Sequence, residues 1–212
     1  MKEFFIIIFL GLISIQNAIQ RDKMIVIYFS RTGNTEKFAN YIQKNANITS
    51  FKIIPSTPYP EDYNTMLNIA KEERETDARP EIQNPLTDIS QYDHILLGYP
   101  IWHSHIPNII ITQLEKLNLS GKTIYPFNTH GGSGVGSSIS DIKTYASGAN
   151  VKDGKPISGN QIQSEEDEVI DWLDDNFDLD SDEGISPITP KNNSNTKIKF
   201  KYYLLISLFI LF

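Results

Sequence analysis

The chain has 212 residues, of which 40% are hydrophobic and 21% are charged, and its formal net charge is −7 at pH 7. This length and composition suit one globular domain with a substantial core, while the negative charge argues against a nucleic-acid partner. Because the chain has no cysteine, disulfides, thiolate nucleophiles and iron–sulfur clusters are excluded, so any redox role would use a bound organic cofactor.

The first residues are typical of a targeting signal. Lys2 precedes an apolar run over residues 4–15, and polar residues and Ala18 follow the run. This order is typical of a secretory signal peptide, so we expect residues 1–20 to direct the chain into the secretory pathway. The run is too short to span a bilayer comfortably, and an uncleaved anchor is the alternative.

A strand, a polar turn and a helix follow in close succession. Residues 24–29 are an apolar run that predicts a buried strand, and residues 35–44 show the periodicity of a helix. The turn between them, residues 30–35, is small and rich in hydroxyl groups. Because a helix start leaves N–H groups unpaired and carries partial positive charge, this turn predicts a phosphate-binding site. An ordinary helix N-cap is the alternative interpretation.

Strands and helices continue to alternate up to residue 177. The predicted strands are residues 50–54, 95–98 and 123–128 and a short fifth near Val151 or Ile157, and the predicted helices are residues 63–75, 107–117, 136–145 and 165–177. This alternation predicts an α/β fold with a doubly wound, five-stranded parallel sheet. In such folds ligands bind outside the carboxyl ends of the strands, so the loops after the first, third and fourth strands are the candidate site.

The loop after the third strand, residues 98–107, reads GYPIWHSHIP. Two prolines stiffen it, and Trp102 lies on the loop rather than on a core element. An aromatic ring at this place suits a flat apolar ligand, whereas core packing is the alternative.

The loop after the fourth strand, residues 128–134, reads NTHGGSG. Its glycines let the backbone approach a planar ligand closely, and their N–H groups can donate to ring carbonyls. A plain flexible turn is the alternative. His103, His105 and His130 lie in these two loops, but no carboxylate or further ligand is adjacent to them, so we expect no metal site.

The C-terminal residues differ in composition from the domain. Residues 179–201 are rich in Ser, Pro, Asn, Asp and Lys and predict a flexible polar stalk. Residues 202–212 are apolar to the last residue, which is the layout of a GPI attachment signal; a tail that dips into one leaflet is the alternative. With the N-terminal signal, this pattern predicts a secreted or cell-surface protein.

Several segments together resemble the short-chain flavodoxin-like family. They are the opening turn, PYPEDYNTMLNIAKEE at residues 58–73, ILLGYPIWHSHIP at 95–107 and LSGKTIYPFNTHGGSGVG at 119–136. The resemblance covers about residues 23–177. It implies a flavodoxin-like domain over residues 21–178 with strand order 2-1-3-4-5, and it implies FMN as the cofactor.

The resemblance also implies which residues contact FMN, and it assigns no catalytic residue. The phosphate loop would comprise Ser30, Thr32, Gly33, Asn34 and Thr35; the second loop Pro100, Ile101, Trp102 and His103; and the third loop Thr129, Gly131, Gly132, Ser133 and Gly134. Tyr59 and Tyr63 flank the loop after the second strand, where one of them either covers the flavin or packs on the surface.

Three functions remain open at this point. The first is an electron carrier that exchanges electrons with a redox partner protein or a small acceptor. The second is an NAD(P)H-dependent quinone reductase, although no separate nicotinamide domain is visible. The third is a non-redox surface module that keeps the fold without the cofactor. The acidic run over residues 165–175 is either a solvated helix face or a surface that attracts a basic redox partner.

Overall fold

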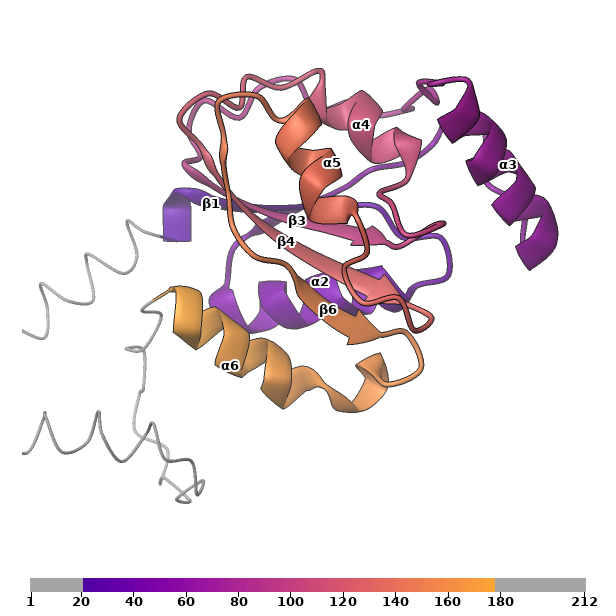
Figure 1. Ribbon diagram of the computed structural model, residues 1–212. Coiled ribbons are helices and arrows are strands. Elements are labelled where there is room, and N and C mark those ends of the chain that lie inside the picture. The colour runs from indigo at the N-terminus through magenta and orange to yellow at the C-terminus, as the bar shows by residue number, and fades with distance from the viewer. Residues whose placement is uncertain (1–20, 178–212) are drawn as a thin grey trace, which may run out of the picture. The chain divides into compact units, whose positions relative to one another are not determined.

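The computed structural model describes residues 21–177, in which strands and helices alternate (Figure 1). The strands are β1 (Met24–Tyr28), β2 (Thr49–Lys52), β3 (His94–Pro100), β4 (Thr123–His130), β5 (Asn150–Val151) and β6 (Lys155–Ser158). The helices are α2 (Asn34–Ala46), α3 (Tyr63–Glu75), α4 (Asn108–Leu114), α5 (Ser138–Tyr145) and α6 (Glu166–Asn176), with the 3-10 turn η1 (Ile162–Ser164) before α6. Each predicted strand and helix is present, and α3 has the predicted bounds.

The strands form one parallel sheet. Their order is β2-β1-β3-β4-β5, and β6 also pairs with β4. This confirms the predicted doubly wound sheet with strand order 2-1-3-4-5. The fifth position is shared, because β5 pairs with the start of β4 and β6 pairs with its end. Both places predicted for the fifth strand, Val151 and Ile157, therefore lie in this position, separated by residues 152–154.

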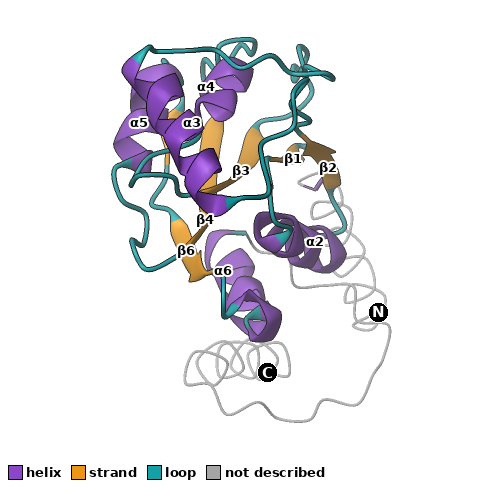
Figure 2. Cartoon of the chain, turned by 90° about the vertical axis from the view of Figure 1, so that its right-hand side faces the viewer, coloured by secondary structure: helices purple, strands orange, loops and turns teal. Residues whose placement is uncertain are grey.

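Helices cover both faces of the sheet, as Figures 1 and 2 show. Helices α3, α4 and α5 lie on one face, and α2 and α6 lie on the other. Because side chains alternate along a strand, β1 directs Ile25 and Ile27 to the first face and Met24 and Val26 to the second. Strands that are buried on both faces need apolar residues throughout, which explains the apolar runs in the sequence.

A glycine in β3 makes room for an aromatic ring from β4. A Cβ built on Gly98 would lie 2.2 Å from Cζ of Phe127 and 2.9 Å from Cβ of Tyr28. Phe127 in turn contacts Phe38 of α2, with 4.7 Å between the ring centroids. Gly98 therefore allows β3, β4 and α2 to pack tightly just before the second candidate loop.

Helices α4 and α5 are shorter than predicted, and α6 is shorter by one residue at each end. Helix α4 ends at Leu114, because the N–H groups of residues 116 and 117 bond to carbonyls only three residues back. Helix α5 begins at Ser138, because Gly136 has a φ of +52° and cannot belong to a right-handed helix.

The predicted targeting signal, stalk and apolar tail, residues 1–20, 179–201 and 202–212, lie outside the described residues. Their roles stay predictions. Within residues 21–177, no helix is both long and apolar enough to cross a membrane.

Candidate cofactor site

The three candidate loops meet at the carboxyl edge of the sheet. The chain leaves β1, β3 and β4 at this edge because the strands are parallel (Figure 1). Thr129 joins the loops: its carbonyl accepts from Ile101 N–H at 2.9 Å, and its hydroxyl lies 2.8 Å from the hydroxyl of Thr35. The residues predicted from separate segments are therefore brought together by direct hydrogen bonds.

The first loop leaves the start of α2 open to an anion. Gly33 has a φ of +90°, and its N–H donates to Ser30 Oγ at 3.2 Å. No side chain caps the N-terminus of α2, so its first N–H groups keep their hydrogen-bonding capacity. Thr32 is exposed beside them. The backbone N–H groups, the hydroxyls and the helix dipole together suit a phosphate group.

The hydroxyl of Thr35 does not face this opening. Thr35 is only 1% exposed, and its hydroxyl bonds to the buried hydroxyl of Thr129. Thr35 was predicted as part of the phosphate loop, and in the structure its hydroxyl also ties two loops together. A contact of Thr35 with a phosphate stays a prediction.

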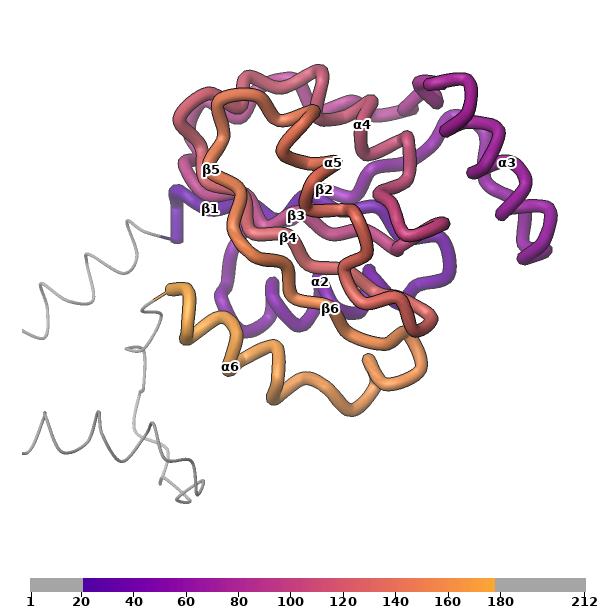
Figure 3. Tube along the Cα trace, in the orientation of Figure 1, coloured from indigo at the N-terminus to yellow at the C-terminus, as the bar shows by residue number. Residues whose placement is uncertain are grey.

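The chain after β6 completes this part of the site. Gly159 N–H donates to the carbonyl of His130 at 2.9 Å, and in Figure 3 the two segments run side by side. A Cβ on Gly159 would lie 2.7 Å from the amide nitrogen of Asn34. Gly159 thus leaves room for the side chain of Asn34, which belongs to the first loop. Gly159 was not among the predicted site residues, although a glycine directly after a strand was a usable signal.

The side chain of Trp102, in the second loop, is buried rather than exposed. It is 6% exposed, and its ring centroid lies 5.6 Å from that of Phe29 and 4.8 Å from that of Tyr59, both in edge-to-face geometry. Core packing accounts for this position, and Tyr59 is part of the same cluster. Tyr63 is 61% exposed. A contact of Trp102 with a flavin stays a prediction.

The residues after Trp102 form a two-residue turn. Trp102 and His105 exchange both backbone hydrogen bonds, at 3.0 and 2.9 Å. Between them, His103 and Ser104 have φ values of +48° and +67°, which side-chain-bearing residues rarely adopt. The neighbouring Pro100 and Ile101 are half-buried at the edge of the sheet.

Contacts from two helices hold this turn in place. His103 Nε2 lies 2.9 Å from the carbonyl of Leu67 in α3. Asp141 of α5 contacts His105 Nδ1 at 2.9 Å and accepts from Ile106 N–H at 3.2 Å. Asp141 is mostly buried, and sequence reasoning missed it because it lies 36 residues from His105. His103 and His105 thus have separate partners.

The third loop presents its glycines to the surface. Gly131, Gly132 and Ser133 are exposed and Gly134 is half-buried. The glycines have no heavy atom within 4 Å of a Cβ built on them, so a ligand can approach the backbone closely there. Further along, a Cβ on Gly136 would lie 2.3 Å from the carbonyl oxygen of Ser104. The second and third loops therefore pack against each other.

Two side chains shape the third loop from within. Asn128 is fully buried and donates to the carbonyl of Gly134 at 3.0 Å, whereas its Oδ1 has no partner among the described residues. His130 Nδ1 accepts from Gly132 N–H at 3.0 Å. Burial lowers the pKa of His130, so the ring is neutral at pH 7 and can keep accepting.

Comparison with protein families identifies one match. A family model described as Flavodoxin matches residues 23–176, which contain all three loops. A search of curated proteins finds no match.

Solved structures with the same fold include three flavoproteins. A putative flavoprotein from Bacteroides eggerthii DSM 20697 is 33% identical and has a TM-score of 0.63; the match covers 72% of this chain and 96% of that chain. A putative flavoprotein from Bacteroides uniformis ATCC 8492 is 28% identical, with a TM-score of 0.63 and coverage of 72% and 97%. A flavoprotein from Lactobacillus acidophilus NCFM in complex with FMN is 25% identical, with a TM-score of 0.57 and coverage of 70% and 99%.

Proposed function

The chain belongs to the flavodoxin family, and from this premise we propose that it binds FMN and transfers electrons. The family match and the FMN complex of the similar Lactobacillus flavoprotein support FMN as the cofactor. The observation that carries the proposal most directly is the uncapped N-terminus of α2, which lies at a loop tied to the second and third loops through Thr129.

The hydrogen-bond donors of the three loops are chemically suited to FMN. The backbone N–H groups at the start of α2, together with Ser30 and Thr32, would bind the phosphate. The exposed backbone of Gly131 and Gly132 would lie along the ring, and the side chain of Trp102 would border it. When bound, FMN supplies one- and two-electron chemistry, and the protein contributes position and electrostatics.

The phosphate contact can be tested by adding a negative charge to the first loop. We expect Thr32→Glu to weaken FMN binding by roughly 100-fold, because a carboxylate beside the phosphate repels it and competes for the same N–H groups. Binding is measured by the quenching of flavin fluorescence. Riboflavin, which has no phosphate, should bind weakly and equally to both proteins.

The matched control is Thr87→Glu, at an exposed residue of another loop, which should leave FMN affinity unchanged. Equal affinities of the native protein for FMN and riboflavin, or an unchanged FMN affinity in Thr32→Glu, would refute this phosphate site.

Electron transfer is tested separately on the FMN-loaded protein. A carrier should be reduced by a chemical donor such as dithionite and reoxidised by an acceptor, with little oxidation of NADH or NADPH. Rapid, quinone-dependent NAD(P)H oxidation would instead support the quinone reductase.

A further inference from the structure

A separate pocket lies between the segment after β2 and helix α3. It has a volume of about 180 Å³ and is mostly apolar. The residues that line this α3 pocket are Thr57, Pro58, Tyr59, Pro60, Ile69, Glu73, Pro80 and Glu81. None of them is among the residues predicted to contact FMN, although Tyr59 was considered as a cover for the flavin.

Backbone contacts join the segment after β2 to the segment after α3 beside the pocket. Ser56 N–H donates to the carbonyl of Glu81 at 2.8 Å, and Gln83 N–H donates to that of Ile54 at 2.8 Å. Three prolines in the lining have fixed φ angles, which restricts the walls further. The pocket is therefore largely formed before any ligand enters, which lowers the entropic cost of binding.

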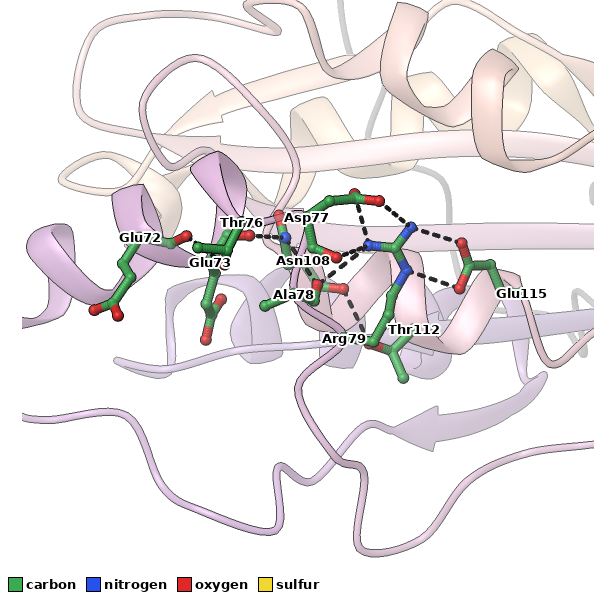
Figure 4. Close-up of polar contacts among 9 residues, drawn as sticks. All are labelled: Glu72, Glu73, Thr76, Asp77, Ala78, Arg79, Asn108, Thr112 and Glu115. Carbon is green, nitrogen blue, oxygen red and sulfur yellow. Dashed lines mark hydrogen bonds and ion pairs between the residues drawn. The ribbon is translucent and has the colours of Figure 1, made fainter.

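A polar network anchors the segment that follows α3, as Figure 4 shows. Arg79 donates to both carboxylate oxygens of Glu115, at 2.8 and 2.9 Å, and also to Asp77 at 2.7 Å. Asn108 donates to the backbone carbonyls of Glu73 and Ala78, at 2.7 and 2.9 Å. This network fixes the backbone next to Pro80 and Glu81 without using the carboxylate of Glu73.

The carboxylate of Glu73 points away from that network (Figure 4). Its Oε2 accepts from the hydroxyl of Tyr59 at 3.0 Å, and its Oε1 receives no hydrogen bond from any described residue. Burial raises the pKa of Glu73 although the bond from Tyr59 opposes this. The residues that line the pocket thus include two acidic residues, Glu73 and Glu81, and no Lys, Arg or His.

We propose that the α3 pocket binds a small organic cation, an apolar group of about the size of a benzene ring that carries a protonated amine. A cavity of about 150 Å³ is known to hold benzene, so the volume fits such a group. The ammonium would donate to Oε1 of Glu73, and the prolines, Ile69 and the ring of Tyr59 would contact the apolar part.

The pocket also adjoins the second loop of the cofactor site. The ring of Tyr59 lines the pocket on one side and packs against Trp102 at 4.8 Å between centroids on the other. A ligand in the pocket should therefore change the fluorescence of Trp102. The proposal concerns residues outside the phosphate loop and does not depend on FMN.

Benzylamine is a suitable probe, and benzyl alcohol is its neutral counterpart of nearly the same shape. We expect saturable binding of benzylamine to the full-length protein in calorimetry, with an affinity at least tenfold higher than that for benzyl alcohol. The affinity should fall as the pH is lowered through the raised pKa of Glu73, because a protonated carboxyl no longer attracts the amine. Equal binding of amine and alcohol, or no binding of either, would overturn the proposal.

Variants of the pocket residues test where benzylamine binds. Glu73→Gln should lower benzylamine affinity at least tenfold, whereas the control Glu75→Gln, at an exposed residue of the same helix paired with Lys71, should not change it. Ile69→Trp fills the pocket without removing a polar contact and should also abolish binding, so it decides the question if Glu73→Gln does not fold. Unchanged affinity in either folded variant would contradict this site.

Loss of FMN binding in Thr32→Glu tests the cofactor site alone, so the two proposals can fail separately.

Discussion

Thr129 is hydrogen-bonded to both of the other loops of the candidate site, once through its side chain and once through its backbone. Its hydroxyl reaches the start of α2 through Thr35, and its carbonyl fixes Ile101 in the second loop. Both hydroxyls are buried, so neither can turn to water if its partner is removed. The contact between the first and third loops thus depends on a pair of small polar side chains.

Removal of one hydroxyl should therefore be costly. We expect Thr129→Val to lower the free energy of unfolding by about 1–3 kcal/mol, because Thr35 is left buried without a partner. Urea denaturation measures the change. Thr87→Val, at an exposed residue, should change stability by less than about 0.5 kcal/mol. If both variants are equally stable, the Thr35–Thr129 bond does not hold the loops.

His130 makes the third loop sensitive to pH. Its Nδ1 accepts from Gly132 N–H, and burial holds its pKa below the ordinary value near 6.5. As the pH falls below about 6.5, the unfolded chain takes up the proton before the folded chain does. The stability that the neutral ring contributes is thus present at higher pH and is lost between the unfolded and the folded pKa.

This dependence can be measured by unfolding at pH 7.5 and 5.5. Asn in place of His130 can still accept from the N–H two residues on, but it does not titrate. We expect the loss of stability between the two pH values to be smaller in His130→Asn than in the native protein. An identical loss in both proteins would show that His130 does not contribute.

Single residues also mark where prediction from the sequence stops. The glycines and hydroxyls of the loops were identifiable because their types and order are unusual. The pairing of Thr35 with Thr129 was not, since the two are 94 residues apart. Whether Trp102 is buried could not be decided from the sequence either, because its neighbour Tyr59 comes from another segment of the chain.

At the scale of elements, the contact between β3 and β4 depends on Gly98. The ring of Phe127 occupies the space that any side chain at residue 98 would need. The same ring contacts Phe38, so it cannot move away without loosening α2, whose N-terminus carries the candidate phosphate site.

We expect Gly98→Ala to lower the free energy of unfolding by about 1–3 kcal/mol through overpacking. Gly131→Ala, where a Cβ meets no atom within 4 Å, is the matched control and should be close to neutral. A second substitution, Phe127→Leu, should recover part of the loss in Gly98→Ala. Denaturation of the native protein, the two single variants and the double variant tests this, and an additive effect of the two substitutions would argue against a clash.

The helices and strands were largely predictable, because the spacing of hydrophobic residues and the positions of turn residues are local properties of the sequence. Helix α3 was predicted residue for residue, and the strand order followed from the resemblance. The start of α5 was missed because it depends on Gly136 approaching Ser104, which is a contact between loops. The role of Asp141 was missed because a helix pattern does not indicate which loop the helix will face.

At the scale of the whole molecule, the net charge of −7 and the acidic start of α6 favour a basic redox partner. We propose such a partner, whose association would weaken with added salt. Export to the secretory pathway, predicted from the two ends of the chain, is likewise a proposal.

We propose above all that FMN binds across the three loops at the carboxyl edge of the sheet. Amide chemical shifts of the isotopically labelled protein, recorded while FMN is added, test it most directly. We expect the largest changes at residues 30–35, 100–103 and 129–134, with little change in α6. A folded protein whose spectrum does not respond to FMN, or whose changes lie away from these loops, would contradict it.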